Sequence, residues 1–299
     1  MKQDNSNKDF SIYACDLCGC DETIEVPHAR IYTNDQAVDI CKNCGFVYVK
    51  KRRSFKTIAK VWSDEMYGNK YTANNPMVLA RQTYIANFSD NYLKLKGKHI
   101  CDIGAGEGQF LNIAKNYGAS VFGIEPSQKN CSNLKKNEID CFQGTIEEYY
   151  SKFKTKKQFD IVFIMWTLEN CNSCKNMISM AHSLLKDNGA IVVATGSRIL
   201  VPFKKPLHMY LTNNFESKEP ADAHAFRFSA NTLKGLLSKS KFEVVHSNPY
   251  IDNDILSVIA LKKETSFEWE KDNYMDVYHF FKRWHAETLL YYPPEEVLD

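Results

Sequence analysis

Hydrophobic and polar residues along 98–195 form a repeating pattern of short apolar runs separated by longer amphipathic stretches. The apolar runs have the length of buried strands and predict strands at 98–103, 120–125, near Cys141, 159–165 and 190–195. The amphipathic stretches predict helices at 107–117, 127–137, 145–153 and 173–186. Because one helix separates each strand from the next, we expect an α/β fold built on a doubly wound, Rossmann-like parallel sheet.

The pattern changes beyond this block. An irregular stretch at 196–228 contains three prolines and precedes a predicted helix at 230–239. Two apolar runs follow at 242–248 and 254–262, and only a turn signal lies between them. They predict a closing antiparallel hairpin, so the last strand of the sheet should run against the others.

Helical patterns also flank the predicted sheet. Residues 61–96 carry apolar positions at helical spacing, with Tyr67 and Tyr71 four apart on one face, and they predict a helical cap. The tail 263–299 is rich in aromatic residues at helical spacing. Such a pattern is typical of a helix that docks onto its own core or onto a second subunit.

The first predicted strand of the sheet leads into a glycine-rich turn. Asp102 precedes glycines at alternate positions, Gly104, Gly106 and Gly108, and such a turn lets the backbone approach a small ligand. The second strand ends in Glu125, 17 residues beyond Gly108, where a carboxylate can accept hydrogen bonds from two ribose hydroxyls. The alternate spacing differs from the G-x-G-x-x-G fingerprint of dinucleotide-binding proteins. The alternative interpretation is an ordinary tight turn beside an exposed glutamate.

This Asp-x-Gly-x-Gly-x-Gly turn resembles motif I of the class I S-adenosylmethionine (SAM) methyltransferases. The closing hairpin resembles the strand pair that separates these enzymes from dehydrogenases. The resemblance implies that the three glycines hold the methionine part of SAM, that Asp102 orients the turn or the SAM ammonium, and that Glu125 binds the ribose. It implies further SAM contacts from residues after the second, third and fourth strands and from the helical cap: Pro126, Thr145, Ile146, Trp166 and Tyr71.

Candidates for proton transfer follow from the same resemblance. Strand four ends near Glu169-Asn170, where many family members carry Glu-His, so Asn170 replaces a possible base and Glu169 either acts itself or braces the loop. His224 lies in a segment that resembles the His-x-x-x-Phe-Ser element of sugar-modifying methyltransferases, and a neutral imidazole suits proton abstraction. Its alternative role is to cap a helix or brace a loop. Tyr67 is a further candidate, and Tyr71 shares its helical face.

Cysteine spacing near the N-terminus predicts a metal centre. Cys15 and Cys18 form one C-x-x-C pair, and Cys41 and Cys44 form another. Four thiolates complete a tetrahedral zinc site and leave no open position, so the site should be structural. Cys20 is a surplus thiol that replaces Cys18 as ligand if the first pair is C-x4-C. A segment this small would draw most of its folding free energy from the metal.

Residues 12–262 together resemble bacterial methyltransferases that combine an N-terminal zinc-binding domain, a helical cap and a class I domain. The predicted divisions are a zinc-ribbon-like domain at 1–58, a helical cap at 59–97, a methyltransferase domain at 98–262 and an aromatic tail at 263–299. The resemblance implies a nucleotide-linked sugar or a surface-polysaccharide precursor as the methyl acceptor. The longer sugar C-methyltransferases of this group carry another large C-terminal domain, so the short tail favours O-methylation over C-methylation.

Charge and composition limit the possible partners. The formal net charge is only +2 in 299 residues, which disfavours a surface built throughout for nucleic acid. A basic run at 50–60 could receive a diphosphate or RNA, or could be a solvated linker. No apolar run approaches the length needed to cross a bilayer, and the N-terminus lacks a signal-peptide core, so we expect a cytoplasmic monomer or homodimer. The alternatives are an RNA methyltransferase and a non-catalytic SAM-binding scaffold.

Overall fold

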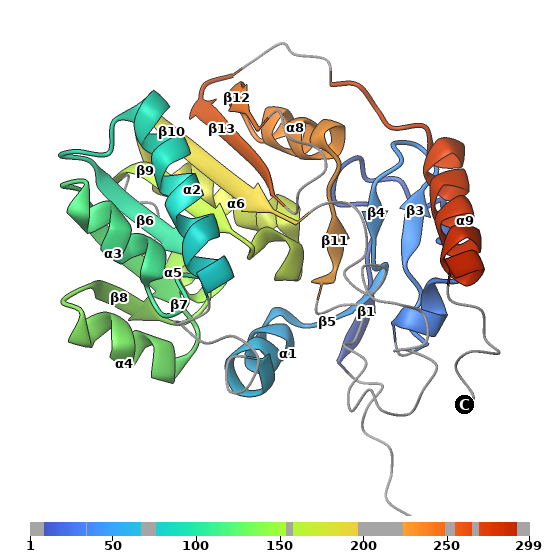
Figure 1. Ribbon diagram of the computed structural model, residues 1–299, viewed down its shortest axis with the longest axis horizontal. Helices are drawn as coiled ribbons and strands as arrows, with labels where there is room; N and C mark the ends of the chain where they lie inside the picture. Colours follow the sequence, from blue (N-terminus) through green and yellow to red (C-terminus); the bar gives the residue numbers. More distant parts are fainter. Residues whose placement is uncertain are drawn as a thin grey trace, which may run out of the picture.

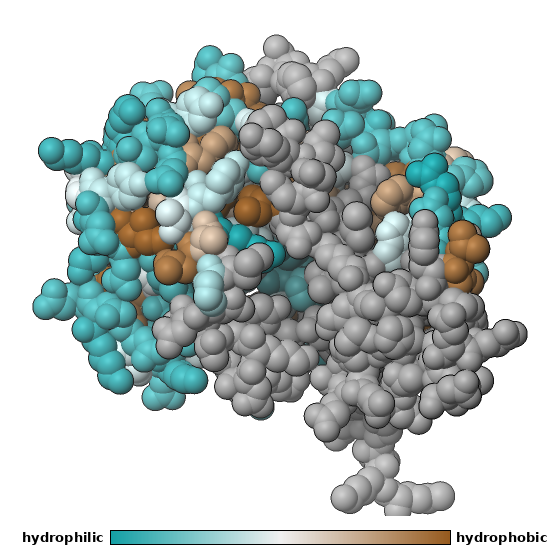
Figure 2. All heavy atoms as spheres, in the orientation of Figure 1, coloured by the Kyte–Doolittle hydropathy of each residue, from teal (hydrophilic) through white to brown (hydrophobic). Residues whose placement is uncertain are grey.

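The computed structural model describes residues 9–33, 35–66, 76–153, 158–196, 224–248, 255–264 and 269–291. Figure 1 shows a large α/β layer on the left, a smaller sheet covered by helix α9 on the right, and helix α1 below and between them. The outer helices of the large layer present a mostly hydrophilic surface in this view (Figure 2). Among the described residues, no helix is long and apolar enough to cross a membrane.

The large layer contains a seven-stranded sheet with the order β12-β13-β10-β9-β6-β7-β8. Its strands are β6 (His99–Ile103), β7 (Ser120–Glu125), β8 (Asp140–Gln143), β9 (Phe159–Met165), β10 (Leu185–Thr195), β12 (Phe242–Ser247) and β13 (Leu256–Lys262). The strands from β6 to β10 pair in parallel, whereas β13 runs antiparallel to β10 and β12. The predicted fold class is therefore confirmed, including the reversed last strand.

Helices cover both faces of this sheet. They are α2 (Pro76–Leu93), α3 (Gln109–Asn116), α4 (Gln128–Lys136), α5 (Ile146–Phe153), α6 (Cys174–Leu184) and α8 (Ala230–Lys239). Serine residues begin three of them, since Ser127, Ser173 and Ser229 each accept a hydrogen bond from the backbone amide three residues later. Side chains of β9 alternate between two buried clusters, with Phe163 in one and Val162 in the other. This alternation is why β9 reads as one continuous apolar run.

Strand β10 starts earlier than the predicted strand at 190–195. Leu185 is fully buried and pairs with Phe159, and the register then shifts before Ala190. Asn188 adopts a left-handed backbone conformation within this interval. Residues 185 and 186, predicted as the end of the helix at 173–186, therefore belong to the irregular first part of this strand.

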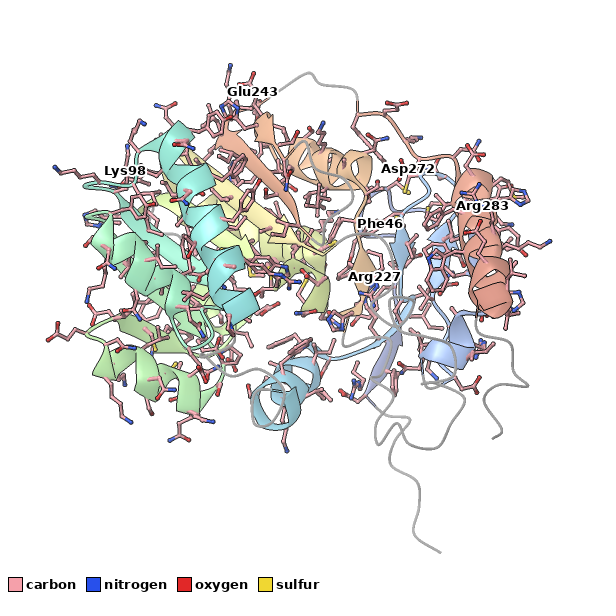
Figure 3. The ribbon with its side chains drawn as sticks, viewed as in Figure 1. Phe46, Lys98, Arg227, Glu243, Asp272 and Arg283 are labelled. Carbon is pink, nitrogen blue, oxygen red and sulfur yellow. The ribbon has the colours of Figure 1, made fainter. Side chains whose placement is uncertain are left out.

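The smaller layer contains a four-stranded sheet with the order β11-β4-β3-β2. Its strands are β2 (Thr23–Glu25), β3 (Asp39–Cys41), β4 (Val47–Tyr48) and β11 (Phe226–Arg227), and β1 (Phe10–Ile12) pairs separately with β5 (Lys51–Arg53). The short 3₁₀ helix η2 (Ala29–Tyr32) lies between β2 and β3. Strand β11 comes from the far half of the chain and pairs with β4, and Figure 3 shows its Arg227 on the side of the small sheet that faces the large layer.

Helix α9 (Tyr274–Tyr291) packs against β3 of the small sheet. Val277, Phe281 and His285 are its most buried residues, and the first two belong to a hydrophobic cluster that continues into the large layer. The aromatic tail thus docks onto the N-terminal part of its own chain, one of the two options that its pattern left open.

A short helical segment links the layers. Helix α1 (Phe55–Lys60) begins at Ser54, whose hydroxyl accepts from the Thr57 amide, and it continues as the π-helical turn η3 (Val61–Met66). The predicted cap at 61–96 corresponds to η3 and α2, and Tyr67 and Tyr71 lie outside the described residues.

Candidate functional site

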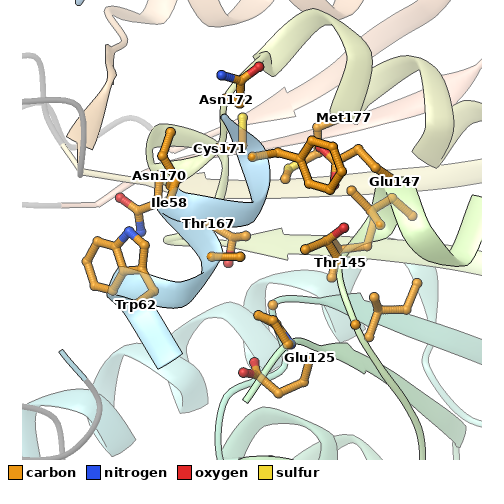
Figure 4. Close-up of a pocket in the computed structure, with 18 of the residues that line it drawn as sticks. Ile58, Trp62, Glu125, Thr145, Glu147, Thr167, Asn170, Cys171, Asn172 and Met177 are labelled. Carbon is orange, nitrogen blue, oxygen red and sulfur yellow. The ribbon is translucent and has the colours of Figure 1, made fainter. Parts of the chain in front are cut away.

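A cavity opens at the carboxyl ends of β6, β7 and β9, the position where open α/β sheets bind ligands. It encloses about 670 Å³, including the space at its open mouth. Figure 4 shows Glu125 and Thr145 on one side, Thr167 and Cys171 on another, and Ile58 and Trp62 of the α1–η3 segment on the near side. Five separate stretches of sequence, within 55–62, 103–104, 124–126, 144–147 and 166–177, therefore build one site.

The glycine turn is shaped by close packing. Gly104, Gly106 and Gly108 all have positive φ angles, which favour glycine. A side chain at Gly104 would collide with Thr167, and one at Gly108 would collide with Leu134. Of the three glycines, Gly104 lines the cavity, whereas Gly106 and Gly108 shape the turn behind it.

Glu125 is held in place before any ligand binds. Its side chain is buried, and its two carboxylate oxygens accept hydrogen bonds from the Gly106 and Ser127 amides, both at 2.8 Å. The Asn130 amide group donates to the same carboxylate at 3.4 Å. Burial raises the pKa of Glu125, and these hydrogen bonds oppose that shift. The fixed carboxylate on the cavity wall suits two neighbouring hydroxyl groups, such as those of a ribose.

Asp102 lies behind the glycine turn and not on the cavity wall. It is 2% exposed, and its Oδ1 atom has no hydrogen-bond partner among the described residues. Burial, together with the nearby Glu125 carboxylate, raises the pKa of Asp102 well above its usual range. A buried carboxylate oxygen of this kind can accept a hydrogen bond from a cationic group such as the SAM ammonium. After a small movement, it can accept one from a backbone amide of the turn instead.

Pro126, Thr145 and Ile146 line the end of the cavity beyond Glu125, and Glu147 lies beside them. The Thr145 amide donates to Glu148 Oε2 at 2.9 Å, which fixes the start of α5. The sequence analysis missed Glu147, because a glutamate in the first turn of a helix is equally typical of helix stabilisation.

The turn after β9 places Trp166 and Asn170 on the cavity wall but not Glu169. Trp166 has a left-handed backbone, and Asn170 Nδ2 donates to its carbonyl oxygen at 2.7 Å. Glu169 is buried and accepts a hydrogen bond from the Gly196 amide at 3.3 Å. Burial raises the pKa of Glu169, whereas Thr195, Gly196 and Arg227 lower it. These contacts are those of a residue that braces the turn.

His224 lies one side chain away from the cavity. Its ring meets the ring of Trp62 edge-on, with centroids 5.2 Å apart, and Trp62 lines the cavity. The other predicted participants from the cap, Tyr67 and Tyr71, lie outside the described residues.

The α1–η3 segment contributes wall residues that the sequence analysis did not single out. Phe55, Ile58, Ala59 and Trp62 all line the cavity. Their spacing of three or four positions puts them on one helical face. The apolar spacing indicates a shared helical face, but no local sequence pattern indicates that this face meets the glycine turn.

The four predicted metal ligands meet in one cluster. The sulfur atoms of Cys15, Cys18, Cys41 and Cys44 all lie within 4.8 Å of one another. The Cys15–Cys44 and Cys18–Cys41 sulfur pairs are 3.7 and 3.4 Å apart, close to the roughly 3.8 Å edge of a tetrahedron with zinc–sulfur bonds of about 2.3 Å. Cys20 stands outside this cluster.

The two halves of the cluster have the same backbone turn. The Gly19 amide donates to Cys15 O at 2.7 Å, and the Gly45 amide donates to Cys41 O at 2.9 Å. Both glycines have positive φ angles. The Cys20 sulfur contacts Glu22, with the Glu22 amide donating at 3.4 Å. The donor set and its spacing fit a structural zinc ion held by Cys18 in preference to Cys20.

The basic run does not form an open anion site on the cavity. Arg52 is fully buried in an ion pair with Asp16, and Lys50 donates to the Asp21 carbonyl oxygen. Lys56 and Lys60 are exposed on α1, which turns a different face to the cavity.

Two curated relatives of this chain are named as ubiquinone biosynthesis O-methyltransferases. The chain is 30% identical over 160 residues to a ubiquinone biosynthesis O-methyltransferase of Pelagibacter ubique, which covers 50% of this chain and 66% of that protein. It is 32% identical over 110 residues to one of Bradyrhizobium diazoefficiens, with coverage of 35% and 42%. The chain thus spans less than two thirds of these curated relatives, and neither is named for a sugar substrate.

A crystal structure of magnesium protoporphyrin IX methyltransferase from Synechocystis PCC 6803 with bound S-adenosylhomocysteine (SAH) superposes with a TM-score of 0.49 at 13% identity. The superposition covers 70% of this chain and 99% of that one. Residues 79–247, more than half of the chain, match a family defined as a methyltransferase domain. The chain therefore belongs to this family, and the matched residues form a class I SAM-dependent methyltransferase domain.

Proposed function

We propose that this protein transfers the methyl group of SAM to a hydroxyl group of a small molecule. The observation that carries this proposal is the single cavity that joins Gly104, Glu125 and Thr145 to an aromatic wall from α1 and η3. The relatives named as O-methyltransferases support oxygen as the methylated atom. Bound SAM supplies an electrophilic methyl group on a sulfonium.

The residues of the chain have distinct roles in this proposal. The Gly104 turn and Glu125 bind and orient the cofactor, and Asp102 orients the turn from behind. Phe55 and Trp62 exclude water and offer flat apolar surfaces, so an acceptor that carries its hydroxyl on an apolar ring fits this wall. The acceptor oxygen forms a bond to the methyl carbon as the carbon–sulfur bond breaks, and the hydroxyl proton leaves to a base.

His224 is the base that we propose. Its imidazole contacts Trp62, which lines the cavity. Glu169 is held by the turn that it braces, so its proposed role is to position Trp166 and Asn170. Tyr67 and Tyr71 remain predicted participants.

A nucleotide-linked sugar is the second candidate acceptor, on the basis of the paired cysteine knuckles followed by basic residues. The burial of Arg52 weakens it, because that side chain is engaged with Asp16. We also propose one structural zinc ion per chain at the four-cysteine cluster, and the domain divisions stated above.

The test uses purified protein and methyl-labelled SAM with host-cell extract, followed by nuclease and protease treatment and separation of small molecules. Label in an apolar or phenolic small-molecule fraction supports the proposal, and label in a nucleotide-sugar fraction selects the second acceptor. Label lost to nuclease would indicate RNA instead. SAM binding without any label, in the extract or with a panel of phenols and nucleotide sugars, would indicate a SAM-binding scaffold.

His224→Gln tests the base directly. It should lower turnover by about 100-fold, a typical contribution of proton transfer, and leave SAM affinity unchanged. His99→Gln, at an exposed position at the start of β6, is the matched control. Wild-type turnover in His224→Gln would remove His224 from this role.

A further inference from the structure

A buried polar network connects the first cysteine knuckle to the start of α6. Asp16 lies between the proposed zinc ligands Cys15 and Cys18. Its Oδ1 accepts a hydrogen bond from Ser173 Oγ at 3.2 Å, and its Oδ2 accepts from Cys174 Sγ at 3.7 Å. The carboxylate of a knuckle residue therefore contacts the segment that follows the cavity wall.

Arg52 completes this network from the other side. Its guanidinium is fully buried, and Nη2 pairs with Asp16 Oδ2 at 3.3 Å while Nη1 donates to Val49 O at 3.0 Å. The guanidinium also lies over the rings of Tyr13 and Phe226, at 4.4 and 4.7 Å from their centroids. Removing two charges from water is costly, so a pair of this kind contributes more to a defined arrangement than to stability.

A second contact runs directly to the cavity. Asn172 lines the cavity together with Cys171. The Asn172 amide group donates to Arg53 O at 2.6 Å and to the Tyr13 hydroxyl at 3.3 Å. Tyr13, before the first knuckle, and Arg53, after the second, are thus both hydrogen-bonded to the loop that lines one side of the cavity.

These contacts have the arrangement expected of two coupled sites. Asp16 contacts Ser173 and Cys174, and Tyr13 contacts Asn172, so the segment around the first knuckle touches the 171–174 loop at three consecutive residues. Neither the family match nor the proposed chemistry assigns a role to Asp16, Arg52 or Asn172.

We propose that Asp16 is a positioning residue that couples the zinc centre to SAM binding. Zinc fixes the knuckle, Asp16 and Arg52 transmit its position to Ser173 and Cys174, and the cavity wall at Asn172 takes the shape that binds SAM. This inference rests on the proposed zinc centre and the proposed function. Coupling between two binding sites is reciprocal, so a bound cofactor must in turn retain the zinc.

The first experiment measures zinc release from the full wild-type chain to a chromophoric chelator, with and without saturating SAH. We expect SAH to slow zinc release by about five- to tenfold, the lower range of typical coupling between sites. A dependence of zinc release on SAH shows that the two sites are coupled, and the Asp16 variant then tests whether Asp16 carries the coupling. This measurement needs no substitution, so it does not depend on the folding of a variant.

Asp16→Asn then tests the pathway. The variant should keep one zinc per chain, bind SAH more weakly by about five- to tenfold, and release zinc at a rate that SAH no longer changes. Glu22→Gln, an exposed carboxylate of the same segment, is the matched control and should retain the wild-type coupling.

The outcomes separate this inference from its premises. A chain that holds no zinc overturns the zinc centre, and a chain that binds no SAH overturns the proposed function, and either result removes the coupling as well. Zinc and SAH that bind independently in the wild type overturn the coupling alone. Coupling that persists unchanged in Asp16→Asn overturns the role of Asp16.

Discussion

In the large layer, the parallel strands from β6 to β10 and most of the covering helices come from one stretch of chain, between 99 and 195. In the small layer, β2, β3 and β4 come from residues 23–48, whereas β11 and α9 come from beyond residue 225. Both layers bury their apolar side chains, and one hydrophobic cluster runs through both. The parallel strands of the large layer thus pair with strands from the same stretch of chain. The small layer also needs a strand and a helix from the far end of the chain.

The difference follows from strand length. The strands of the small sheet contain two or three residues each, whereas β9 contains seven and β10 eleven. Strands this short bury too little surface to offset the entropy of ordering them. We therefore expect the small layer to depend on the proposed zinc centre and on two distant segments of chain, and the large layer to depend mainly on its own packing.

Loss of the proposed zinc centre should produce the largest difference in amide protection between the two layers. Cys41→Ser removes one of four thiolates, and apparent zinc-binding free energies of about 10 kcal/mol or more then no longer support the small layer. We expect less than one zinc per chain and a loss of amide hydrogen-exchange protection in β3, β4 and α9, with β9 and β10 still protected.

Cys20→Ser is the matched control for that experiment. Its sulfur contacts Glu22 outside the four-thiol cluster, so the variant should keep one zinc per chain and wild-type protection. Equal loss of zinc in both variants would mean that Cys20 is a ligand. Full protection of the small layer in Cys41→Ser would mean that packing sustains both layers.

Core truncation in the large layer should have the next largest effect. Phe163 of β9 is fully buried, and its ring lies 4.4 Å from that of Phe110. Phe163→Ala should lower the free energy of unfolding by about 3–5 kcal/mol, measured by urea denaturation, and leave the zinc content unchanged. Phe153→Ala, at a position 42% exposed, should cost about 1 kcal/mol or less. Zinc loss in Phe163→Ala would show that the two layers unfold as one.

The same contrast explains what the sequence could predict about the fold. The strands and helices of the large layer follow from local periodicity, because each strand is long enough to show its burial pattern. Strand β11 has two residues, and its pairing with β4 joins Phe226 to Tyr48 across most of the chain. No local pattern encodes such a contact, and the docking of α9 on β3 was unspecified for the same reason.

The site divides in a similar way. Gly104, Glu125, Thr145 and Trp166, which glycine spacing and strand ends picked out in the sequence, all line the same cavity. Their contact with SAM stays a prediction. The wall from the α1–η3 segment, including Trp62, could not be predicted, because it depends on how a linker crosses the sheet edge.

Glu125 allows the cofactor site to be tested apart from the metal centre. Glu125→Gln retains the shape of the side chain but removes its charge, and hydrogen bonds to charged groups contribute about 1.5–3 kcal/mol. SAH affinity, measured by calorimetry, should therefore fall by about 10- to 100-fold while the zinc content stays at one per chain. Glu138→Gln, at an exposed position after α4, should match the wild type. Unchanged affinity in Glu125→Gln would remove the ribose assignment.

The smallest expected effect is a pH dependence confined to the small layer. The rings of His28 and His285 stack with centroids 3.9 Å apart and join the start of η2 to α9. Burial, and then the neighbouring His28, lowers the pKa of His285 from 6.5. Below that value the unfolded chain binds more protons than the folded one. The stability of this contact is therefore fully present above about pH 6.5 and decreases as the pH falls.

Hydrogen exchange of α9 amides, corrected for intrinsic rates, should show protection that falls on the order of a few-fold between about pH 7.5 and about pH 5.5. The strand ends that carry Asp102 and Glu125 should not lose protection over that interval, because burial raises the pKa of both carboxyls and proton binding there favours the folded state. His285→Gln should abolish the pH dependence of α9, whereas His279→Gln, exposed on the same helix, should retain it. An undiminished pH dependence in His285→Gln would mean that a group other than His285 controls how the docking of α9 responds to acid.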